Sequence, residues 1–354
     1  MKPPSLRFIY LISSLLIIVS LSCTTLTRLS SEPEESLPAS PFVEPSGEMP
    51  GADTPLSEIP SPTPEEVDTS PEATPPPAET VPPAEPGPCA EEVCILDGYF
   101  LLKRPISPDG RNTIVYTDRF GSYRSATRNA LRGVYFLNSS GTPVLASADG
   151  EVVVAGDDSQ MPYGPRLNMY GNLVILKHDL SALSQPLFTL YAHLSQVSVE
   201  VGETVTAGDE VGLVGMSGDV SGSILLFEVR LGENHPTAAR NPELWLEPLS
   251  DDTGQLQGAF AGRVVDSNGK MLKISNIVVE RLAGPGLPAI DQLYLKTYSE
   301  NSLMGLDPWE ENFAAGDLPA GEYQLSFYYE GDLQQRVVEV QRGRLTLVIF
   351  ELNK

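Results

Sequence analysis

The stretch Tyr170-Gly-Asn-Leu-Val-Ile-Leu-Lys-His178 indicates the fold class. Asn172 to Lys177 is a strand-like run whose centre, Leu173 to Leu176, is wholly apolar, and a turn glycine, Gly171, precedes it. A short apolar run beside such a signal is typical of a β-strand. Comparable runs, rich in Val, Ile, Leu and Tyr, recur with glycine-containing turns between them at 144–148, 151–155, 187–191, 211–214 and 225–230. Because no long segment has helical periodicity, the sequence predicts an all-β protein.

Local turn signals divide the folded region further. Asp149-Gly150 stands between two strand-like runs and predicts a tight β-hairpin at that point. The chain after Cys89 is long enough for two ordinary domains, and the polar segment 250–255 predicts a boundary between them. We therefore expect one β domain over 89–250 and a second over 256–354.

The second domain has the alternation and turn glycines of a β-sandwich. It resembles the carboxypeptidase regulatory-like (transthyretin-like) domains of exported proteins. The resemblance rests on a G-x-V-x-D-x-x-G pattern from Gly262 to Gly269 and an L-P-x-G-x-Y pattern from Leu318 to Tyr323. It implies architecture rather than chemistry.

The N-terminus has the features of an export signal. Lys2 and Arg7 are followed by an apolar run from Phe8 to Leu21, which is shorter than the roughly 20 residues that a membrane span needs. The small residue before Cys23 resembles a bacterial lipobox, which predicts a signal peptide over 1–22 and lipidation of Cys23. The alternatives are an uncleaved anchor and plain secretory cleavage, and each of the three places the rest of the chain outside the cytoplasm.

Residues 23–88 differ in composition from the rest, because Pro, Glu, Ser and Thr dominate and apolar residues are scarce. Such a segment cannot bury enough surface to offset the entropy of ordering it. Its prolines favour extended geometry and its carboxylates repel one another. The sequence predicts a disordered, stiff tether that holds the folded region away from a lipid surface.

Charge and cysteine content exclude some functions. The formal net charge of −24 argues against nucleic acid as a partner, since a polyanion binder needs clustered cations. Cys89 and Cys94 form a close pair, and in an oxidising compartment they are expected to form a small disulfide loop. Two cysteines alone make an improbable metal site, and no matching His or Cys pair lies nearby.

The first domain resembles the lysostaphin/LytM-type zinc endopeptidases, which cut peptide cross-links in bacterial cell walls on a small all-β scaffold, the duplicated hybrid motif fold. The resemblance runs from about Tyr116 to Leu249. Its motifs follow the order of the family and lie at 141–146, 148–152, 170–178, 190–195, 201–208, 214–218 and 227–230.

The chemistry that this resemblance implies is missing from the residues. The family holds zinc with an H-x-G-x-D pattern and the second His of an H-x-H strand, and two further His assist the attacking water. These patterns fall on Leu131-Arg-Gly-Val-Tyr135 and on Ile224-Leu-Leu226, so only His193 remains of the set. Catalytic zinc needs three protein donors. Leu131 and Leu226 have none, and a Tyr135 phenol with an ordinary pKa near 10 is a poor lone ligand. We expect no metal, no zinc cofactor and no catalytic residue, with His193 as a relic and the cleft closed by packing.

The remaining histidines and aromatics have simpler interpretations. We expect His178 to be structural and His235 to lie in a loop. Aromatic residues of the second domain could recognise sugars or surface proteins, but their spacing makes core positions the better expectation; they are Trp309, Tyr323, Phe327, Tyr328 and Tyr329.

Two functions therefore compete. The first is a pseudoenzyme: an extracytoplasmic, lipid-anchored envelope protein whose peptidase-like domain binds peptidoglycan or a protein partner, or regulates a cell-wall hydrolase. The second is an active zinc-dependent cell-wall endopeptidase with an atypical ligand set. No His occurs between Cys89 and Gly171, so a register shift cannot restore a histidine near Leu131.

Overall fold

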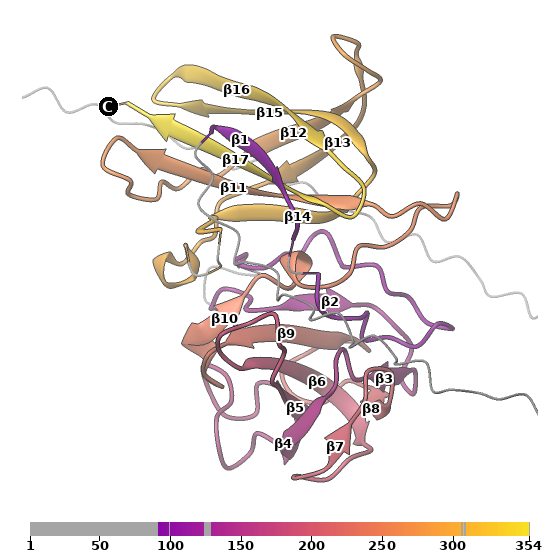
Figure 1. Ribbon diagram of the computed structural model, residues 1–354. Coiled ribbons are helices and arrows are strands. Elements are labelled where there is room, and N and C mark those ends of the chain that lie inside the picture. Colours follow the sequence, from indigo (N-terminus) through magenta and orange to yellow (C-terminus); the bar gives the residue numbers. More distant parts are fainter. Residues whose placement is uncertain (1–90, 99, 124–128, 306, 308, 354) are drawn as a thin grey trace, which may run out of the picture. The chain divides into compact units, whose positions relative to one another are not determined.

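The computed structural model describes residues 91–98, 100–123, 129–305, 307 and 309–353, all within one compact unit of the chain (Figure 1). The predicted signal peptide, the tether, Cys23 and Cys89 lie outside the described residues. The all-β prediction is confirmed, because the only helices in the described ranges are three short 3-10 turns: η1 (Pro236–Ala238), η2 (Pro242–Leu244) and η3 (Asn301–Leu303). Within the same ranges, no helix has the length and hydropathy needed to span a membrane.

The first part of the fold is a nine-stranded sheet whose paired strands run antiparallel. Six strands follow the order β10-β9-β6-β5-β4-β7, while β2 adds to β9 and β8 joins β3 to β6. The strands are β2 (Val134–Phe136), β3 (Pro143–Leu145), β4 (Gly150–Asp157), β5 (Asn172–His178), β6 (Leu187–Val197), β7 (Thr204–Val205), β8 (Glu210–Val214), β9 (Leu225–Leu231) and β10 (Ala239–Arg240). The first eight residues of β6 are buried, which makes β6 the centre of the sheet.

The hairpin predicted at Asp149-Gly150 is wrong. β3 pairs with β8, whereas β4 pairs with β5 and β7. Asp149 instead fastens neighbouring elements: its carboxylate accepts a hydrogen bond from the Ala207 backbone N–H at 2.8 Å, and its carbonyl lies 2.8 Å from Nδ1 of His178. The chain does bend before Gly150, but the strands on either side of the bend pair with other strands and not with each other.

The C-terminal part consists of two four-stranded sheets (Figure 1). One has the order β1-β17-β11-β14 and contains β1 (Val93–Leu96), β11 (Gly258–Asp266), β14 (Phe313–Leu318) and β17 (Leu345–Leu352). The other has the order β13-β12-β15-β16 and contains β12 (Ile277–Leu282), β13 (Ala289–Leu295), β15 (Gly321–Tyr329) and β16 (Asp332–Val340). A single apolar cluster takes Phe260, Phe313 and Phe350 from the first sheet and Leu325 and Phe327 from the second, so the two sheets share a core.

β1 has a position that the sequence did not indicate. It precedes the nine-stranded sheet in the chain, yet it pairs antiparallel with β17, from Val93 opposite Val348 to Leu96 opposite Leu345. Cys94 lies in this strand and is disulfide-bonded. Its predicted partner, Cys89, lies outside the described residues, so the Cys89–Cys94 pairing stays a prediction.

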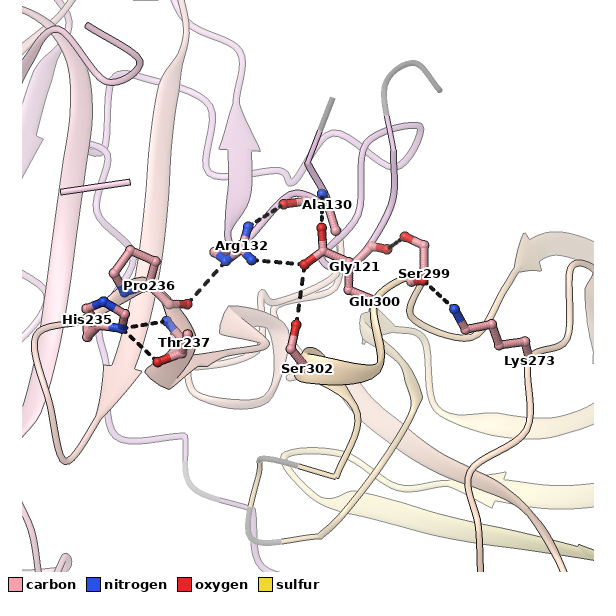
Figure 2. Close-up of polar contacts among 10 residues, drawn as sticks. All are labelled: Gly121, Ala130, Arg132, His235, Pro236, Thr237, Lys273, Ser299, Glu300 and Ser302. Atoms are coloured by element: carbon pink, nitrogen blue, oxygen red, sulfur yellow. Dashed lines mark hydrogen bonds and ion pairs between the residues drawn. The ribbon is translucent and has the colours of Figure 1, made fainter. Parts of the chain in front are cut away.

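The nine-stranded sheet and the sheet of β11 and β17 are joined by packing and by polar contacts. Trp245, Trp309 and Leu347 belong to one buried apolar cluster with core residues of the larger sheet. Trp245 Nε1 donates to the Asp307 carboxylate at 2.8 Å. Figure 2 shows a second set of contacts, in which the Arg132 guanidinium donates to Glu300 at 2.9 Å. The other Glu300 oxygen accepts from the Ala130 N–H at 2.8 Å.

Candidate functional site

The four positions to which the sequence resemblance assigns the family's zinc and catalytic residues lie together. Tyr135 in β2 stands directly opposite Leu226 in β9, and Leu131 precedes β2. Ile224 immediately precedes β9 and forms a bridge with Gly215. These side chains come from segments almost 90 residues apart, and strand pairing alone brings them into one cluster.

The site cluster is apolar and closed to solvent. Leu131 and Tyr135 are each 6% exposed, Ile224 is 8% exposed and Leu226 is 1% exposed. The other buried members are Tyr170, Leu173, Ile175, Phe188, Leu190 and Ala192. Burial of each aliphatic side chain stabilises the fold by roughly 1.5–3 kcal/mol, so this packing holds β2, β5, β6 and β9 together.

Gly133 keeps a structural role in the strand pairing around the site, although the side chains beside it cannot bind a metal. A Cβ atom at this position would lie 2.2 Å from the Phe227 carbonyl oxygen, because β2 approaches β9 closely here. Glycine is therefore required by the strand pairing itself, whatever occupies the neighbouring positions.

His193 is buried beside the site cluster in an unusual backbone conformation. It lies in β6 with φ = 66°, a left-handed value that non-glycine residues seldom adopt. Nδ1 lies 2.9 Å from the Ser217 carbonyl, so this nitrogen carries the hydrogen of a neutral ring. The ring stacks on Tyr135, with centroids 6.2 Å apart and planes 23° from parallel. Burial lowers the pKa of His193, although the bond to Ser217 opposes the shift.

The residues of this site do not fit a zinc ion. Zinc needs three donors with lone pairs and an open position for water, and three of the four positions carry aliphatic carbon. Across the part of the chain that the structure describes, no group of three or more His, Cys, Asp or Glu is arranged to hold a metal. The polar groups that the site brings together are the His193 imidazole and the phenols of Tyr135 and Tyr170, which can form hydrogen bonds and aromatic contacts.

A buried polar network connected to the site cluster through Tyr170 was not predicted from the sequence. The Tyr170 hydroxyl donates to the Glu228 carboxylate, and Arg230 donates to the same carboxylate through Nε at 3.1 Å and through a terminal nitrogen at 2.7 Å. Arg230 also donates to Asn234 Oδ1 at 3.0 Å and to the Tyr163 carbonyl at 2.8 Å. Burial, and then the Glu228 charge, raise the pKa of Tyr170 well above its usual range. The alternation of charged and apolar residues in Phe-Glu-Val-Arg was the available signal.

The other two histidines have structural contacts. His178 is fully buried, and its Nε2 lies 2.7 Å from the Thr189 hydroxyl while Nδ1 faces the Asp149 carbonyl. His235 precedes η1 and its Nδ1 accepts from the Thr237 N–H at 3.3 Å (Figure 2). Both positions agree with the structural and loop interpretations of the sequence.

The aromatic residues of the C-terminal part divide between the core and the surface. Trp309, Tyr323 and Phe327 are buried, as their spacing predicted, and Tyr329 is half-buried. Tyr328 differs, because it is 72% exposed on the opposite face of β15.

Comparisons with known proteins identify several relatives. The family model Peptidase family M23 matches residues 129–238. Cell division protein DipM of Caulobacter vibrioides is 39% identical over 111 residues, which are 31% of this chain and 16% of that protein. Murein hydrolase activator NlpD of Escherichia coli is 34% identical over 105 residues, 30% of this chain and 24% of that protein.

A relative with an enzyme's name also matches. DD-carboxypeptidase/endopeptidase Mpg of Neisseria meningitidis is 31% identical over 147 residues, 42% of this chain and 30% of that protein. The chain thus spans less than a third of the length of each of these relatives. Among solved structures, the catalytic domain of lysostaphin from Staphylococcus simulans is 27% identical, covers 37% of this chain and 88% of its own, and has a TM-score of 0.31.

Proposed function

We propose that this chain, whose residues 129–238 are a Peptidase family M23 domain, is a pseudoenzyme of the cell envelope. In this proposal the domain binds peptidoglycan or regulates a cell-wall hydrolase, and it cuts nothing itself. The observation that carries the proposal is the site cluster: Leu131, Tyr135, Ile224 and Leu226 fill the positions of donor residues with buried side chains. A water molecule cannot be activated there by a metal, since the donors that would hold the metal are absent.

The names of the relatives support a regulatory role. NlpD is named a murein hydrolase activator and DipM a cell division protein. We propose the same class of partner here: peptidoglycan, or a hydrolase that acts on it.

Metal content tests the loss of catalysis. The full chain, purified at neutral pH, is expected to contain no stoichiometric zinc by elemental analysis. A variant that combines Leu131→His, Tyr135→Asp and Leu226→His restores the three donors and provides the positive control. One zinc per wild-type chain, removable by chelator, would refute the pseudoenzyme assignment.

Binding and activation test the positive role. Full-length chain on beads should retain isolated sacculi or a hydrolase from envelope extract, and the soluble chain should increase dye release from labelled sacculi by that hydrolase. Heat-denatured chain is the control. Retention no greater than that control, together with unchanged dye release, would reject the regulatory role.

The second candidate is an active endopeptidase with an atypical ligand set. The name of Mpg and the stacked His193–Tyr135 pair, the polar groups that remain at the site, favour it. The test is a zymogram on cell-wall substrate with added zinc. Clearing by the wild-type chain that disappears in His193→Ala would establish this candidate, and an absence of clearing is the result we expect.

We also propose that Cys23 is lipidated and anchors the chain outside the cytoplasm, that residues 23–88 are a tether, and that two β domains meet near residues 250–256. Cys23→Ser should move the chain from the membrane fraction to the soluble fraction. Retention of this variant in the membrane fraction would favour an uncleaved anchor.

A further inference from the structure

A cavity of about 810 Å³ lies outside the site cluster, between two edge strands. β13 ends one sheet of the C-terminal part and β14 ends the other. Leu293, Tyr294 and Leu295 of β13 line the cavity, as do Ala314 and Leu318 of β14. The segment 116–122 also contributes to the lining, and none of the lining residues belongs to the site cluster.

The free edge of β13 gives the cavity backbone hydrogen-bonding capacity. β13 pairs with β12 along one side, and in the described residues no strand pairs with its other side. Every second residue of an edge strand directs its N–H and C=O away from the sheet, where an added strand can bond them. The residues of β13 are exposed except for Leu293, which is half-buried, and Leu295, which is buried, so the edge is accessible.

The residues that line the cavity have a net positive charge, whereas the whole chain is negatively charged. Its charged lining residues are three cations, Arg119, Arg281 and Lys296, and two carboxylates, Asp291 and Asp317, on a chain whose formal net charge is −24. Arg119 is already paired with Glu243. Arg281 and Lys296, by contrast, have no carboxylate within 4.0 Å among the described residues. Arg281 donates to the Ala320 carbonyl at 3.2 Å, so Lys296 and the remaining guanidinium nitrogens of Arg281 are available to a carboxylate of a ligand.

Buried polar atoms in the lining also lack partners. Ser122 is 6% exposed, and its hydroxyl forms no hydrogen bond within the described structure. Asp317 is also 6% exposed; one carboxylate oxygen is held by Arg104 and by the Leu249 N–H at 2.9 Å, while the other has no partner. A hydroxyl and a carboxylate oxygen can be satisfied together by a ligand that carries both C=O and N–H groups, which is the composition of a peptide.

Exposed aromatic rings complete the lining. Tyr116 is 51% exposed and Tyr294 is 60% exposed, and the Arg119 guanidinium lies over the Tyr116 ring, 4.8 Å from its centroid. Such rings supply contact area to a ligand at small entropic cost.

From these observations we infer that the cavity binds a short peptide with free carboxylates, whose amide groups bond to the free edge of β13 and whose carboxylate lies against Arg281 and Lys296. This inference rests on the proposed envelope function, because in that setting the stem peptides of peptidoglycan have this chemistry. The cavity is separate from the site cluster, so the chain would bind peptidoglycan peptides without using any residue of that cluster.

The probe is the synthetic tripeptide L-alanyl-γ-D-glutamyl-meso-diaminopimelate, titrated calorimetrically into the full chain. Binding is expected, with a loss of about tenfold in affinity for Arg281→Gln and for Lys296→Gln, since each removes a charge-assisted contact. Lys270→Gln, an exposed lysine outside the cavity, is the matched control and should bind as wild type. The amidated tripeptide should bind the wild-type chain as weakly as the free tripeptide binds the charge variants, and N-methylation of its amides should weaken binding by removing the N–H donors to the β13 edge.

Three outcomes would overturn the inference: no binding of the tripeptide by a chain with native circular dichroism, equal binding by the variants, or equal binding of the amidated peptide. Retention of sacculi by Arg281→Gln at the wild-type level would leave the proposed function intact and remove only this site. Loss of hydrolase retention in the variants, without tripeptide binding, would reassign the β13 edge to a strand of a partner protein and reject the stem-peptide ligand.

Discussion

Truncation of Leu226 measures directly whether the former cleft is packed. Leu226 is 1% exposed, so Leu226→Ala removes three fully buried carbon atoms. At about 0.8 kcal/mol for each buried methyl or methylene group, the transfer term is about 2.4 kcal/mol. The cavity left between Tyr135 and Leu131 adds to this loss, because the surrounding β strands collapse only partly. We expect the free energy of unfolding to fall by about 3–4 kcal/mol, within the range of buried Leu→Ala changes.

The assay is urea unfolding of the full chain, followed by tryptophan fluorescence and by circular dichroism. Both tryptophans, Trp245 and Trp309, are buried in the same apolar cluster and report on its loss. The matched control is Leu333→Ala in β16, where the side chain is 50% exposed and the loss should be about 0.5 kcal/mol. If Leu226→Ala costs no more than Leu333→Ala, the site is an open cleft and the reasoning fails.

Three further predictions concern single groups. Burial and the neighbouring Asp307 raise the pKa of Glu311 well above its usual value, so the folded state loses stability as pH rises from about 4.5. Glu311→Gln should therefore raise the melting temperature at pH 7 and not at pH 4, whereas Glu233→Gln, at an exposed position, should change neither. An equal effect of Glu311→Gln at both pH values would contradict this. The pKa of His193 is lowered in the folded state, so protonation favours unfolding and stability should fall as pH drops below about 6.5. In thermal melts at pH 5–7, His193→Asn should weaken that dependence, because asparagine tolerates the left-handed backbone but does not titrate. In urea titrations, Gly171→Ala should lower the free energy of unfolding far more than Gly202→Ala. Both glycines have positive φ, but only at Gly171 would the new Cβ lie 2.4 Å from a backbone nitrogen. Similar losses for the two variants would show that the backbone shifts freely at Gly171.

Much of the fold followed from local sequence signals. The run Asn172–Lys177 corresponds to β5, and Leu225–Arg230 corresponds to β9 with one residue added. These strands were visible because each contains a buried apolar run, Leu173–Leu176 in β5 and Leu225–Phe227 in β9. The error at Asp149-Gly150 has a physical cause: the partner of β3 lies some 65 residues further along the chain, and a dipeptide carries no information about so distant a pairing.

The site was predictable in composition and only partly in geometry. The identities of Leu131 and Leu226 already ruled out donor atoms, because that depends on chemistry alone. The stacking of His193 on Tyr135 depends on a left-handed residue at a bulge of β6, which no local pattern announces. The network of Tyr170, Glu228 and Arg230 likewise depends on Tyr170 meeting β9, a strand more than 50 residues further along the chain.

The pairing of β1 with β17 constrains how this protein can be divided for experiments. A fragment that ends near Leu249 keeps β1 but removes the strand to which it bonds. A fragment that starts at Leu256 keeps β17 and leaves one of its edges bare, and an uncovered strand of eight residues rich in Val, Leu, Ile and Phe invites intermolecular association. Recombinant pieces cut at the linker between the sheets would therefore tend to aggregate, and a soluble C-terminal piece would need Val93–Leu96 supplied as a fused or added peptide.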